Sequence, residues 1–271
     1  MCKHNLKGGP MRKIRIIAIL AVMLVYPSFA LSEPIVFIVA GQSTAKCGLV
    51  EEVATGDLRT PHQLKEYHVL DMDYSEKPRI VQTFDQRSHF GPEVRFVQLY
   101  VKANPSREVI LLKMVKNGSG MTRWSPKWPG EYDQWTGDLY RILVDFVIEA
   151  VDGRDVEWGG FLFVQGENDS VYPERARAYV QNLRNLVNRL REDLGAPKMP
   201  VMTSEVSPVL EKYPHQYQVN QAKINAALTG RDMFVVSNSA LGYREDGIHF
   251  TSDAVLQLGM RFFWTYRTLL K

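Results

Sequence analysis

Cysteine is nearly absent from this 271-residue sequence, which contains only Cys2 and Cys47. Cys2 lies in a leader-like segment described below, so a processed chain would retain Cys47 alone and could form no internal disulfide. A lone cysteine is more often a small buried apolar residue than a catalytic thiol, and the sequence leaves both readings open for Cys47. Stability must therefore come from a hydrophobic core, which a chain of this length with 45% hydrophobic residues can build.

A hydrophobic run long enough to cross a membrane is also missing. The longest one, residues 16–25, has about half of the roughly 20 residues that a spanning helix needs. Basic residues precede it from Met11 onward, and the small residues Ser28 and Ala30 follow it with the spacing of a cleavage site. We therefore predict that residues 1–30 are a signal peptide and that the protein is exported, either to the periplasm or by secretion. An uncleaved N-terminal anchor is the alternative.

The sequence has no dense stripe of basic residues, although it contains 33 basic and 30 acidic residues. Five basic residues and no acidic ones lie within residues 1–30. Without that segment, 28 basic residues face 30 acidic ones, and the formal net charge changes from +3 to −2. This balance gives no support for nucleic-acid binding, and we expect no membrane association once the signal is cleaved.

Short apolar runs alternate with amphipathic stretches along the rest of the chain. The runs at residues 35–40, 109–115, 160–164, 201–205 and 234–237 are typical of strands that are covered on both faces. Apolar residues at helical spacing recur at 92–103, 139–150, 179–194 and 252–269. This alternation predicts a single domain over residues 31–271 with a three-layer α/β/α fold of the flavodoxin-like type and a mainly parallel five-stranded sheet.

Polar residues follow two of these strands in a way that predicts a nucleophile and its base. Ser43 comes directly after the first strand, either as a helix cap or as a hydroxyl that projects from the carboxyl edge of the sheet. A serine needs a base, and His249 lies just before the last helix, three residues after Asp246. That spacing lets the carboxylate reach Nδ1 of the imidazole and leaves Nε2 to accept the serine proton.

Two further strand ends carry groups that can stabilise negative charge. Gly118 follows the strand at 109–115, and its N–H could approach a ligand closely. Gln165 and Asn168 follow the strand at 160–164, and either amide could donate a hydrogen bond to an oxyanion. Ordinary turn chemistry would also explain each of these residues when it is considered alone.

Five short blocks follow one another along the chain: residues 41–44 (Gly-Gln-Ser-Thr), 91–93 (Gly-Pro-Glu), 117–119 (Asn-Gly-Ser), 165–169 (Gln-Gly-Glu-Asn-Asp) and 246–249 (Asp-Gly-Ile-His). With these blocks in this order, the sequence resembles an SGNH-type hydrolase of the sialate O-acetylesterase-like branch, which is related to carbohydrate esterase family six. Thr44 stands where the family usually has Asn, and Asn117 replaces a glycine. Neither departure touches the predicted nucleophile, base or acid.

The resemblance implies roles for these residues. Ser43 would be the nucleophile, His249 the general base and Asp246 the residue that orients it. The oxyanion hole would consist of the N–H groups of Ser43 and Gly118 plus one amide side chain. The wider SGNH pattern favours Asn168 for that amide, and the narrower family pattern favours Gln165. The resemblance implies no metal or organic cofactor, and the sequence Asp71-Met-Asp73 is weak support for a metal site.

The expected substrate is an acetylated carbohydrate, either a sialic acid or a polysaccharide. We expect substrate contacts from Gln42, Glu167, Arg123 and Trp124. The segment 124–135, with Trp124, Trp128, Tyr132 and Trp135, is a candidate stacking wall in which Arg123 and Lys127 could meet an acidic sugar. A surface loop held by its own tryptophans is the alternative. A carbohydrate-binding relative without activity, or an SGNH lipase or thioesterase, are the competing functions.

Overall fold

The computed structural model describes Met1 and residues 33–126, 136–209 and 211–269, and contacts group Ser32–Lys271 into one compact unit. Apart from Met1, the predicted signal segment lies outside the described residues, so its existence stays a prediction. No helix within the described ranges has both the length and the apolarity needed to span a membrane.

The central sheet has seven strands in the order β4-β3-β6-β1-β7-β8-β9. All neighbouring strands are parallel except β3 and β4. The predicted mainly parallel α/β fold is therefore confirmed, with seven strands rather than five. The strands are β1 (Ile35–Gly41), β3 (Leu64–Asp71), β4 (Arg79–Ile80), β6 (Val109–Val115), β7 (Glu157–Val164), β8 (Val201–Ser204) and β9 (Met233–Val236). The two-residue strands β2 (Gly48–Leu49) and β5 (His89–Phe90) pair separately.

The two additional strands lie at one edge of the sheet, where burial is incomplete. The first half of β3 is only partly buried and contains Lys65 and Glu66, so it does not have the continuous apolar pattern of the central strands. Both residues of β4 are exposed. An edge strand needs one buried face at most, and for this reason the sequence of residues 49–90 resembles an irregular segment.

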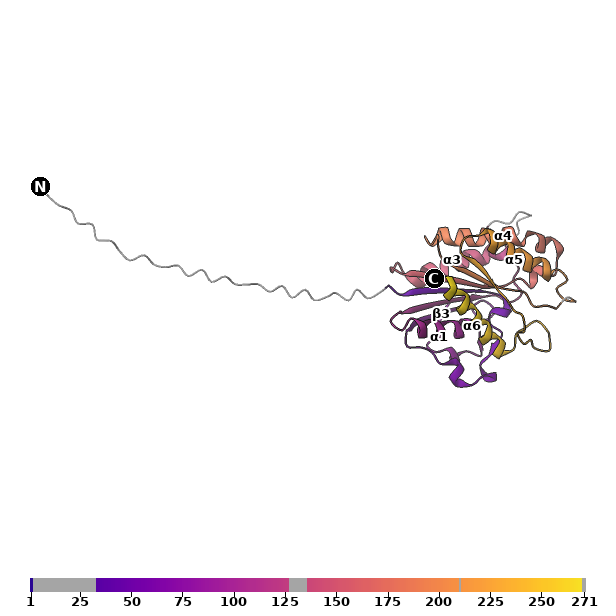
Figure 1. The fold of residues 1–271 in the computed structure, drawn as a ribbon, viewed down its shortest axis with the longest axis horizontal. Coiled ribbons are helices and arrows are strands. Elements are labelled where there is room, and N and C mark those ends of the chain that lie inside the picture. The colour runs from indigo at the N-terminus through magenta and orange to yellow at the C-terminus, as the bar shows by residue number, and fades with distance from the viewer. Residues whose placement is uncertain (2–32, 127–135, 210, 270–271) are drawn as a thin grey trace. The chain divides into compact units, whose positions relative to one another are not determined.

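Helices cover both faces of the sheet, and Figure 1 shows α1 and α6 on one side with α3, α4 and α5 on the other. Ile35 and Phe37 of β1 pack in the core with α1 and α6, whereas Val36 and Ile38 pack with the other three helices. The helices are α1 (Glu93–Ala103), the short α2 (Met121–Trp124), α3 (Asp138–Val151), α4 (Pro173–Asp193), α5 (Gln216–Thr229) and α6 (Ser252–Leu269).

Helix α5 is absent from the sequence-based prediction because its buried face is narrow and interrupted by charge. Its buried residues are Val219, Ala222, Lys223 and Ala226, so a lysine occupies a position where a core residue is expected. Lys223 is fully buried and donates to the backbone carbonyls of Gln165 and Ser204, each at 2.6 Å. The helix is thus attached to the loop after β7 by hydrogen bonds as well as by apolar packing.

Strand β1 is the topological switch point of the sheet, where the order in which strands are added reverses. It lies between β6 and β7, and the strands that follow it in sequence are placed first on one side and then on the other. In open parallel sheets, the loops on the two sides of such a point separate and leave a crevice at the carboxyl ends of the strands. The loops after β1, β6 and β7 therefore meet at one place.

A buried ion pair supports this crevice from below. Lys113 of β6 and Glu93 at the start of α1 are both fully buried and paired, and the Tyr67 hydroxyl and the Gly91 N–H also donate to Glu93 Oε1. A Cβ atom at Gly91 would lie 2.0 Å from the Ala45 carbonyl oxygen, so only glycine fits against the turn after β1. The Gly-Pro-Glu block thus joins α1, β6 and that turn.

Candidate active site

Ser43 lies just beyond the carboxyl end of β1, at the start of a single 3₁₀ turn, η1 (Ser43–Ala45). Gly41 ends the strand with φ +151°, and a Cβ atom there would lie 2.0 Å from the Val164 carbonyl oxygen. Only glycine lets β1 stay paired with β7 up to the point where the chain turns. The Gln42 N–H donates to the same oxygen at 3.1 Å, which fixes the direction in which the serine leaves the strand.

The structure brings Ser43, His249 and Asp246 together, although the serine and the histidine are 206 positions apart in the sequence. Ser43 Oγ lies 2.9 Å from His249 Nε2, and His249 Nδ1 lies 2.6 Å from Asp246 Oδ2. With its Nδ1 proton donated to the carboxylate, the imidazole presents the Nε2 lone pair to the serine hydroxyl. The three side chains are thus arranged as nucleophile, base and acid in one chain of hydrogen bonds.

The Asp246 carboxylate is held in its charged form. Burial acts to raise its pKa, but this effect is outweighed by the hydrogen bonds from the His249 ring and from the N–H groups of His249 and Ile248, which lower the pKa to about 2. An ionised carboxylate at this position keeps the Nδ1 proton in place and would stabilise the imidazolium formed during proton transfer.

The turn that carries His249 is fixed through its backbone. Gly247 adopts φ +69°, which a glycine tolerates in a tight turn. The Arg244 N–H donates to the His249 carbonyl at 2.7 Å, and the Ser207 hydroxyl donates to the Ile248 carbonyl at 2.7 Å. These bonds hold the backbone of the turn in place, and the imidazole ring of His249 faces Ser43.

Two backbone N–H groups are free to bind an oxyanion. Within the described parts of the chain, neither the Ser43 N–H nor the Gly118 N–H donates to a protein acceptor. Gly118 has φ +61° in the turn after β6, and the preceding Asn117 N–H donates to Asp73 Oδ2 at 2.9 Å. This anchor sets the position of the Gly118 peptide.

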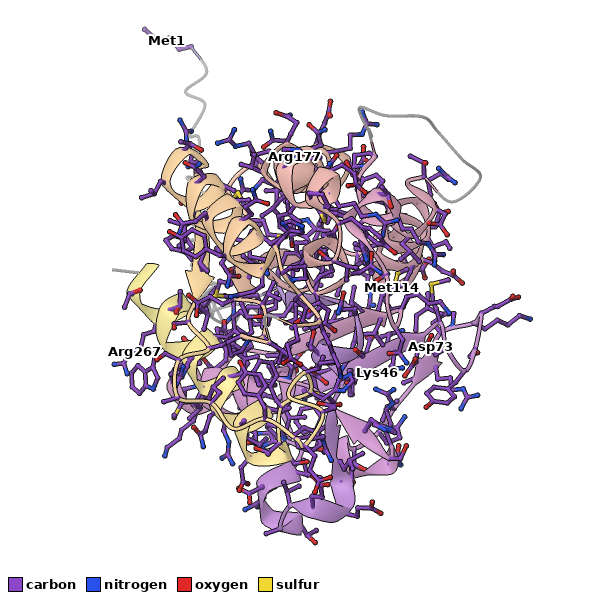
Figure 2. All side chains as sticks on the ribbon, turned by 90° about the vertical axis from the view of Figure 1, so that its right-hand side faces the viewer. Met1, Lys46, Asp73, Met114, Arg177 and Arg267 are labelled. Atoms are coloured by element: carbon purple, nitrogen blue, oxygen red, sulfur yellow. The ribbon has the colours of Figure 1, made fainter. Side chains whose placement is uncertain are left out.

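Asp73 belongs to an ion-pair network in which cations surround the predicted Asp71-Met-Asp73 pair. Lys46 contacts Asp71 at 2.6 Å and Asp73 at 2.9 Å, and Lys46 and Asp73 are labelled in Figure 2. Arg87 contacts Asp71 at 2.9 Å, and Lys116 contacts Asp73 at 2.9 Å. The two carboxylates are therefore shared among three cations, which leaves one positive charge in excess. Asp73 also supports the turn that carries Gly118, a role that the sequence reading of a weak metal motif missed.

The structure distinguishes between the two predicted amides. Gln165 is buried, and its Nε2 donates to the Ser119 carbonyl at 3.0 Å and to Asp169 Oδ2 at 2.5 Å, which uses both of its protons. Asn168 Nδ2 donates only to the Gly118 carbonyl at 2.8 Å. One Asn168 proton therefore remains for an oxyanion, and the alternative assignment to Gln165 does not fit.

A cavity of about 260 Å³ opens over the serine and the histidine. Tyr74, His89 and Arg244 line it together with Ser43 and His249. The sequence reading missed these three lining residues because no local motif marks them. Tyr74 and His89 lie in the segment 49–90, and Arg244 precedes the Asp-Gly-Ile-His block without being part of it.

The predicted aromatic sugar wall is not supported by the described residues. Trp124 is fully buried, and its Nε1 donates to Ser119 Oγ at 2.9 Å, so it is a core residue and cannot stack on a substrate. Arg123 is paired with Asp138 at the start of α3. Lys127, Trp128, Tyr132 and Trp135 lie outside the described residues.

Three other predicted residues beside the site have little exposed surface. Gln42 and Glu167 are each 3% exposed, so direct substrate contact, which we expected, does not fit them. Burial raises the pKa of Glu167, although the charge of Lys223 opposes this. Burial also raises the pKa of Cys47 to about 12, so this thiol is a buried apolar residue and not a nucleophile.

The fold and the site together define a class of protein. A three-layer α/β/α unit with a serine after the first strand and an Asp-x-x-His turn before the last helix is the arrangement of SGNH-type hydrolases. The family model described as carbohydrate esterase, sialic acid-specific acetylesterase, matches residues 34–268. The chain belongs to this family.

Individual relatives are more distant. A probable carbohydrate esterase of Arabidopsis thaliana is 27% identical over 108 residues, which is 39% of this chain and only 38% of that protein. An Arabidopsis thaliana structure superposes with a TM-score of 0.70 at 20% identity and covers 87% of this chain and 98% of its own. A carbohydrate acetylesterase from Xanthomonas citri superposes with a TM-score of 0.65 at 12% identity, and the match covers 86% of this chain and 55% of that protein. At these identities the structures establish the fold alone.

The pKa of Asp246 gives a testable dependence of stability on pH. The carboxyl changes from an ordinary value of 3.8 to about 2 on folding, so its hydrogen bonds stabilise the fold above about pH 4 and are lost as the pH falls toward 2. We expect Asp246→Asn to lower the free energy of unfolding by a constant amount above pH 4, with the difference from wild type shrinking toward zero at pH 2. Urea unfolding at several pH values measures this, and a difference independent of pH would contradict it.

Proposed function

We propose that the chain is an exported serine esterase that removes O-acetyl groups from a carbohydrate, either a sialic acid or an acetylated polysaccharide. The single observation that carries the proposal is the hydrogen-bonded series from Ser43 Oγ through His249 to Asp246. Membership of a carbohydrate esterase family supports the class of bond that is cleaved. The apolar leader at residues 16–25 supports export.

In the proposed mechanism, Ser43 Oγ attacks the acetyl carbonyl carbon while His249 Nε2 takes the hydroxyl proton. The carbonyl oxygen becomes an oxyanion, which the N–H groups of Ser43 and Gly118 and the free Asn168 amide proton stabilise. The tetrahedral intermediate collapses, His249 returns the proton to the departing sugar oxygen, and an acetyl-serine remains. Water, deprotonated by His249, then attacks this ester, and acetate leaves as Ser43 regains its proton.

The size of the cavity favours a short acyl group. A volume of about 260 Å³ over Ser43 is below the usual range for drug-sized ligands. A lipase or thioesterase would need room for a long apolar chain, whereas this cavity is lined by the polar residues Lys46, His89 and Arg244. A binding protein without activity would have no need for a serine aligned on a histidine and an ionised carboxylate.

Replacing the nucleophile tests the mechanism directly. We expect Ser43→Ala to lower kcat on 4-nitrophenyl acetate by at least about 10³-fold, because among the described residues no other hydroxyl is hydrogen-bonded to His249. The circular dichroism spectrum should not change. Ser106→Ala, at an exposed position before the N-terminal end of β6, is the matched control and should retain full activity. Full activity in the Ser43 variant would end the serine mechanism.

The two amides should respond differently to truncation. Asn168→Ala removes an oxyanion donor and should lower kcat by about 10²–10³-fold with little change in the free energy of unfolding. Gln165→Ala removes one hydrogen bond from buried Asp169, which keeps the Met121 N–H, and one from the Tyr179 hydroxyl, which keeps the Gln165 carbonyl. We expect a cost of about 0.5–1.5 kcal/mol for each bond lost. Kinetics and urea unfolding of both variants separate the roles, and a purely kinetic defect in the Gln165 variant would reverse the assignment.

Export makes a prediction about the N-terminus. If residues 1–30 are cleaved, protein recovered from the periplasm or the medium of an expressing bacterial host should begin at Leu31. Intact-mass measurement determines this. Recovery of the unprocessed chain from the cytoplasm alone would argue against a signal peptide and leave the esterase proposal unaffected.

A further inference from the structure

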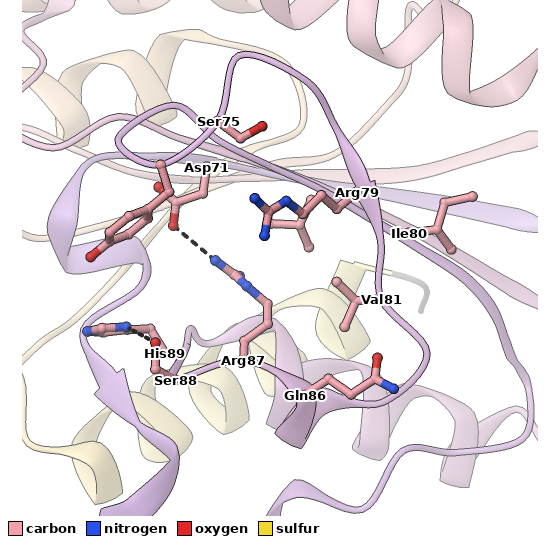
Figure 3. Close-up of a pocket in the computed structure, with 11 residues that line it drawn as sticks. Asp71, Ser75, Arg79, Ile80, Val81, Gln86, Arg87, Ser88 and His89 are labelled. Atoms are coloured by element: carbon pink, nitrogen blue, oxygen red, sulfur yellow. Dashed lines mark hydrogen bonds and ion pairs between the residues drawn. The ribbon is translucent and has the colours of Figure 1, made fainter.

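A second and larger cavity, of about 610 Å³, adjoins the one over the serine. Tyr74 and His89 line both cavities, so these two side chains stand between them. The walls of the larger cavity come from the end of β3, from β4 and from the segment before β5, as Figure 3 shows. Its volume lies within the range of small-molecule sites, and nothing in the proposed mechanism uses it.

Two arginines dominate the charge of this cavity. Figure 3 shows the side chains of Arg79 and Arg87 extending toward its centre from opposite sides. Arg79 is exposed, and among the described residues its guanidinium has no hydrogen-bond or ion-pair partner. Arg87 donates to Asp71 at 2.9 Å, and its Nη1 atom has no partner in the described part of the chain.

The nearby carboxylate does not neutralise these cations. Asp71 is the sole acidic residue among those that line the cavity, and it also accepts the short contact from Lys46 at 2.6 Å. One negative charge is therefore shared between Lys46 and Arg87, while Arg79 is uncompensated. A cavity with this excess of positive charge attracts and retains anions.

The pKa of His89 also reflects the positive charge of this cavity. Its pKa is lowered, first by burial and then by the positive charges of Lys46 and Arg87, so the ring is neutral near pH 7. Ser88 Oγ lies 2.8 Å from His89 Nδ1, and this pair is a neutral hydrogen-bonding group on the cavity wall. The cavity thus combines cationic donors with neutral polar ones.

The rim carries exposed apolar groups. Tyr74 is 69% exposed and Ile80 is 61% exposed, which is unusual for residues of this size. Lys46 Nζ lies 4.8 Å from the centre of the Tyr74 ring and holds it at the boundary between the two cavities. An exposed aromatic ring beside a polar cavity is suited to the apolar face of a sugar ring.

We propose that the larger cavity binds the carboxylate of an acidic saccharide whose acetyl ester lies at Ser43, with Arg79 as the main ion-pair donor and Tyr74 beneath the sugar. Arginine presents a planar fork of donors that matches a carboxylate, which makes it the residue of choice for this recognition. The position of the ester rests on the proposed esterase function. Carboxylate binding itself requires no catalysis and can be measured separately.

The binding test uses Ser43→Ala protein, so that no ester is cleaved during the titration. N-acetylneuraminic acid and its methyl ester differ in the charge of one carboxylate and are titrated by NMR or calorimetry. We expect the acid to bind roughly tenfold more tightly than the ester, in line with a charge-assisted hydrogen bond. Adding Arg79→Gln should remove the difference, and added salt should reduce it.

The kinetic test compares kcat/KM for an acetylated acid and for its methyl ester, so the ratio cancels any general loss of activity. One substrate pair is an O-acetylated sialic acid, with the carboxylate on the acetylated sugar. The other is an acetylated xylo-oligosaccharide with a glucuronic acid branch, with the carboxylate on a neighbouring sugar. A ratio of about ten in either pair supports the site and identifies the source of the carboxylate.

The variants decide whether Arg79 is responsible. Arg79→Gln should bring the ratio close to one, and Arg79→Lys should partly restore it because the charge remains. Arg231→Gln is the matched control: Arg231 is exposed and precedes the N-terminal end of β9, at the opposite edge of the parallel sheet from Ser43. It should leave the ratio unchanged.

A ratio near one for both wild-type pairs, or a ratio that Arg79→Gln does not change, overturns the carboxylate site and leaves the serine mechanism intact. If instead Ser43→Ala retains esterase activity while the acid still binds more tightly through Arg79, the proposed mechanism fails and the anion site stands.

Discussion

The hydrogen bond between Ser43 Oγ and His249 Nε2 is the interaction on which the rest of this site depends, because it joins the end of the central strand β1 to the turn before the last helix. It forms only if β1 stops at the right residue. Gly41 allows that stop by its contact with Val164, and Gly91 allows the following turn to rest on the start of α1. Two positions without a side chain thus determine where a reactive hydroxyl is placed.

A buried lysine lies under each of the three loops that meet at the crevice. Lys113 pairs with Glu93 below the nucleophile turn, Lys46 pairs with the two aspartates that hold the oxyanion turn, and Lys223 donates to carbonyls of the loop after β7. Desolvating such groups is unfavourable, and removing one partner of a buried pair usually costs about 3–5 kcal/mol. Their geometry fixes loop positions that apolar packing alone would leave adjustable.

Much of the site could be predicted from the sequence because parallel strands end at a common edge, so polar residues after strand ends are brought together. Ser43, Asp246 and His249 follow from that rule and from their blocks. The same rule does not predict which of these residues are buried. Trp124 and Gln42 are residue types that often contact sugars, but both are buried in the structure. Strand β3 lies next to the edge of the sheet and is only partly buried, so neither it nor the loop with Tyr74 has a clear apolar period, and both were missed. The choice between Gln165 and Asn168 depends on hydrogen-bond partners distant in sequence.

The acid and the base of this site stand three residues apart in one turn, and the carboxylate of Asp246 accepts bonds from the backbone of that same turn. Their mutual geometry is therefore local and independent of the sheet. Ser43 comes from a different part of the fold. A small rigid-body shift of the turn would therefore lengthen the hydrogen bond between His249 and Ser43 and preserve the one between His249 and Asp246. If the proposed mechanism holds, activity depends on one distance, that between the Asp246–His249 pair and Ser43 at the end of β1.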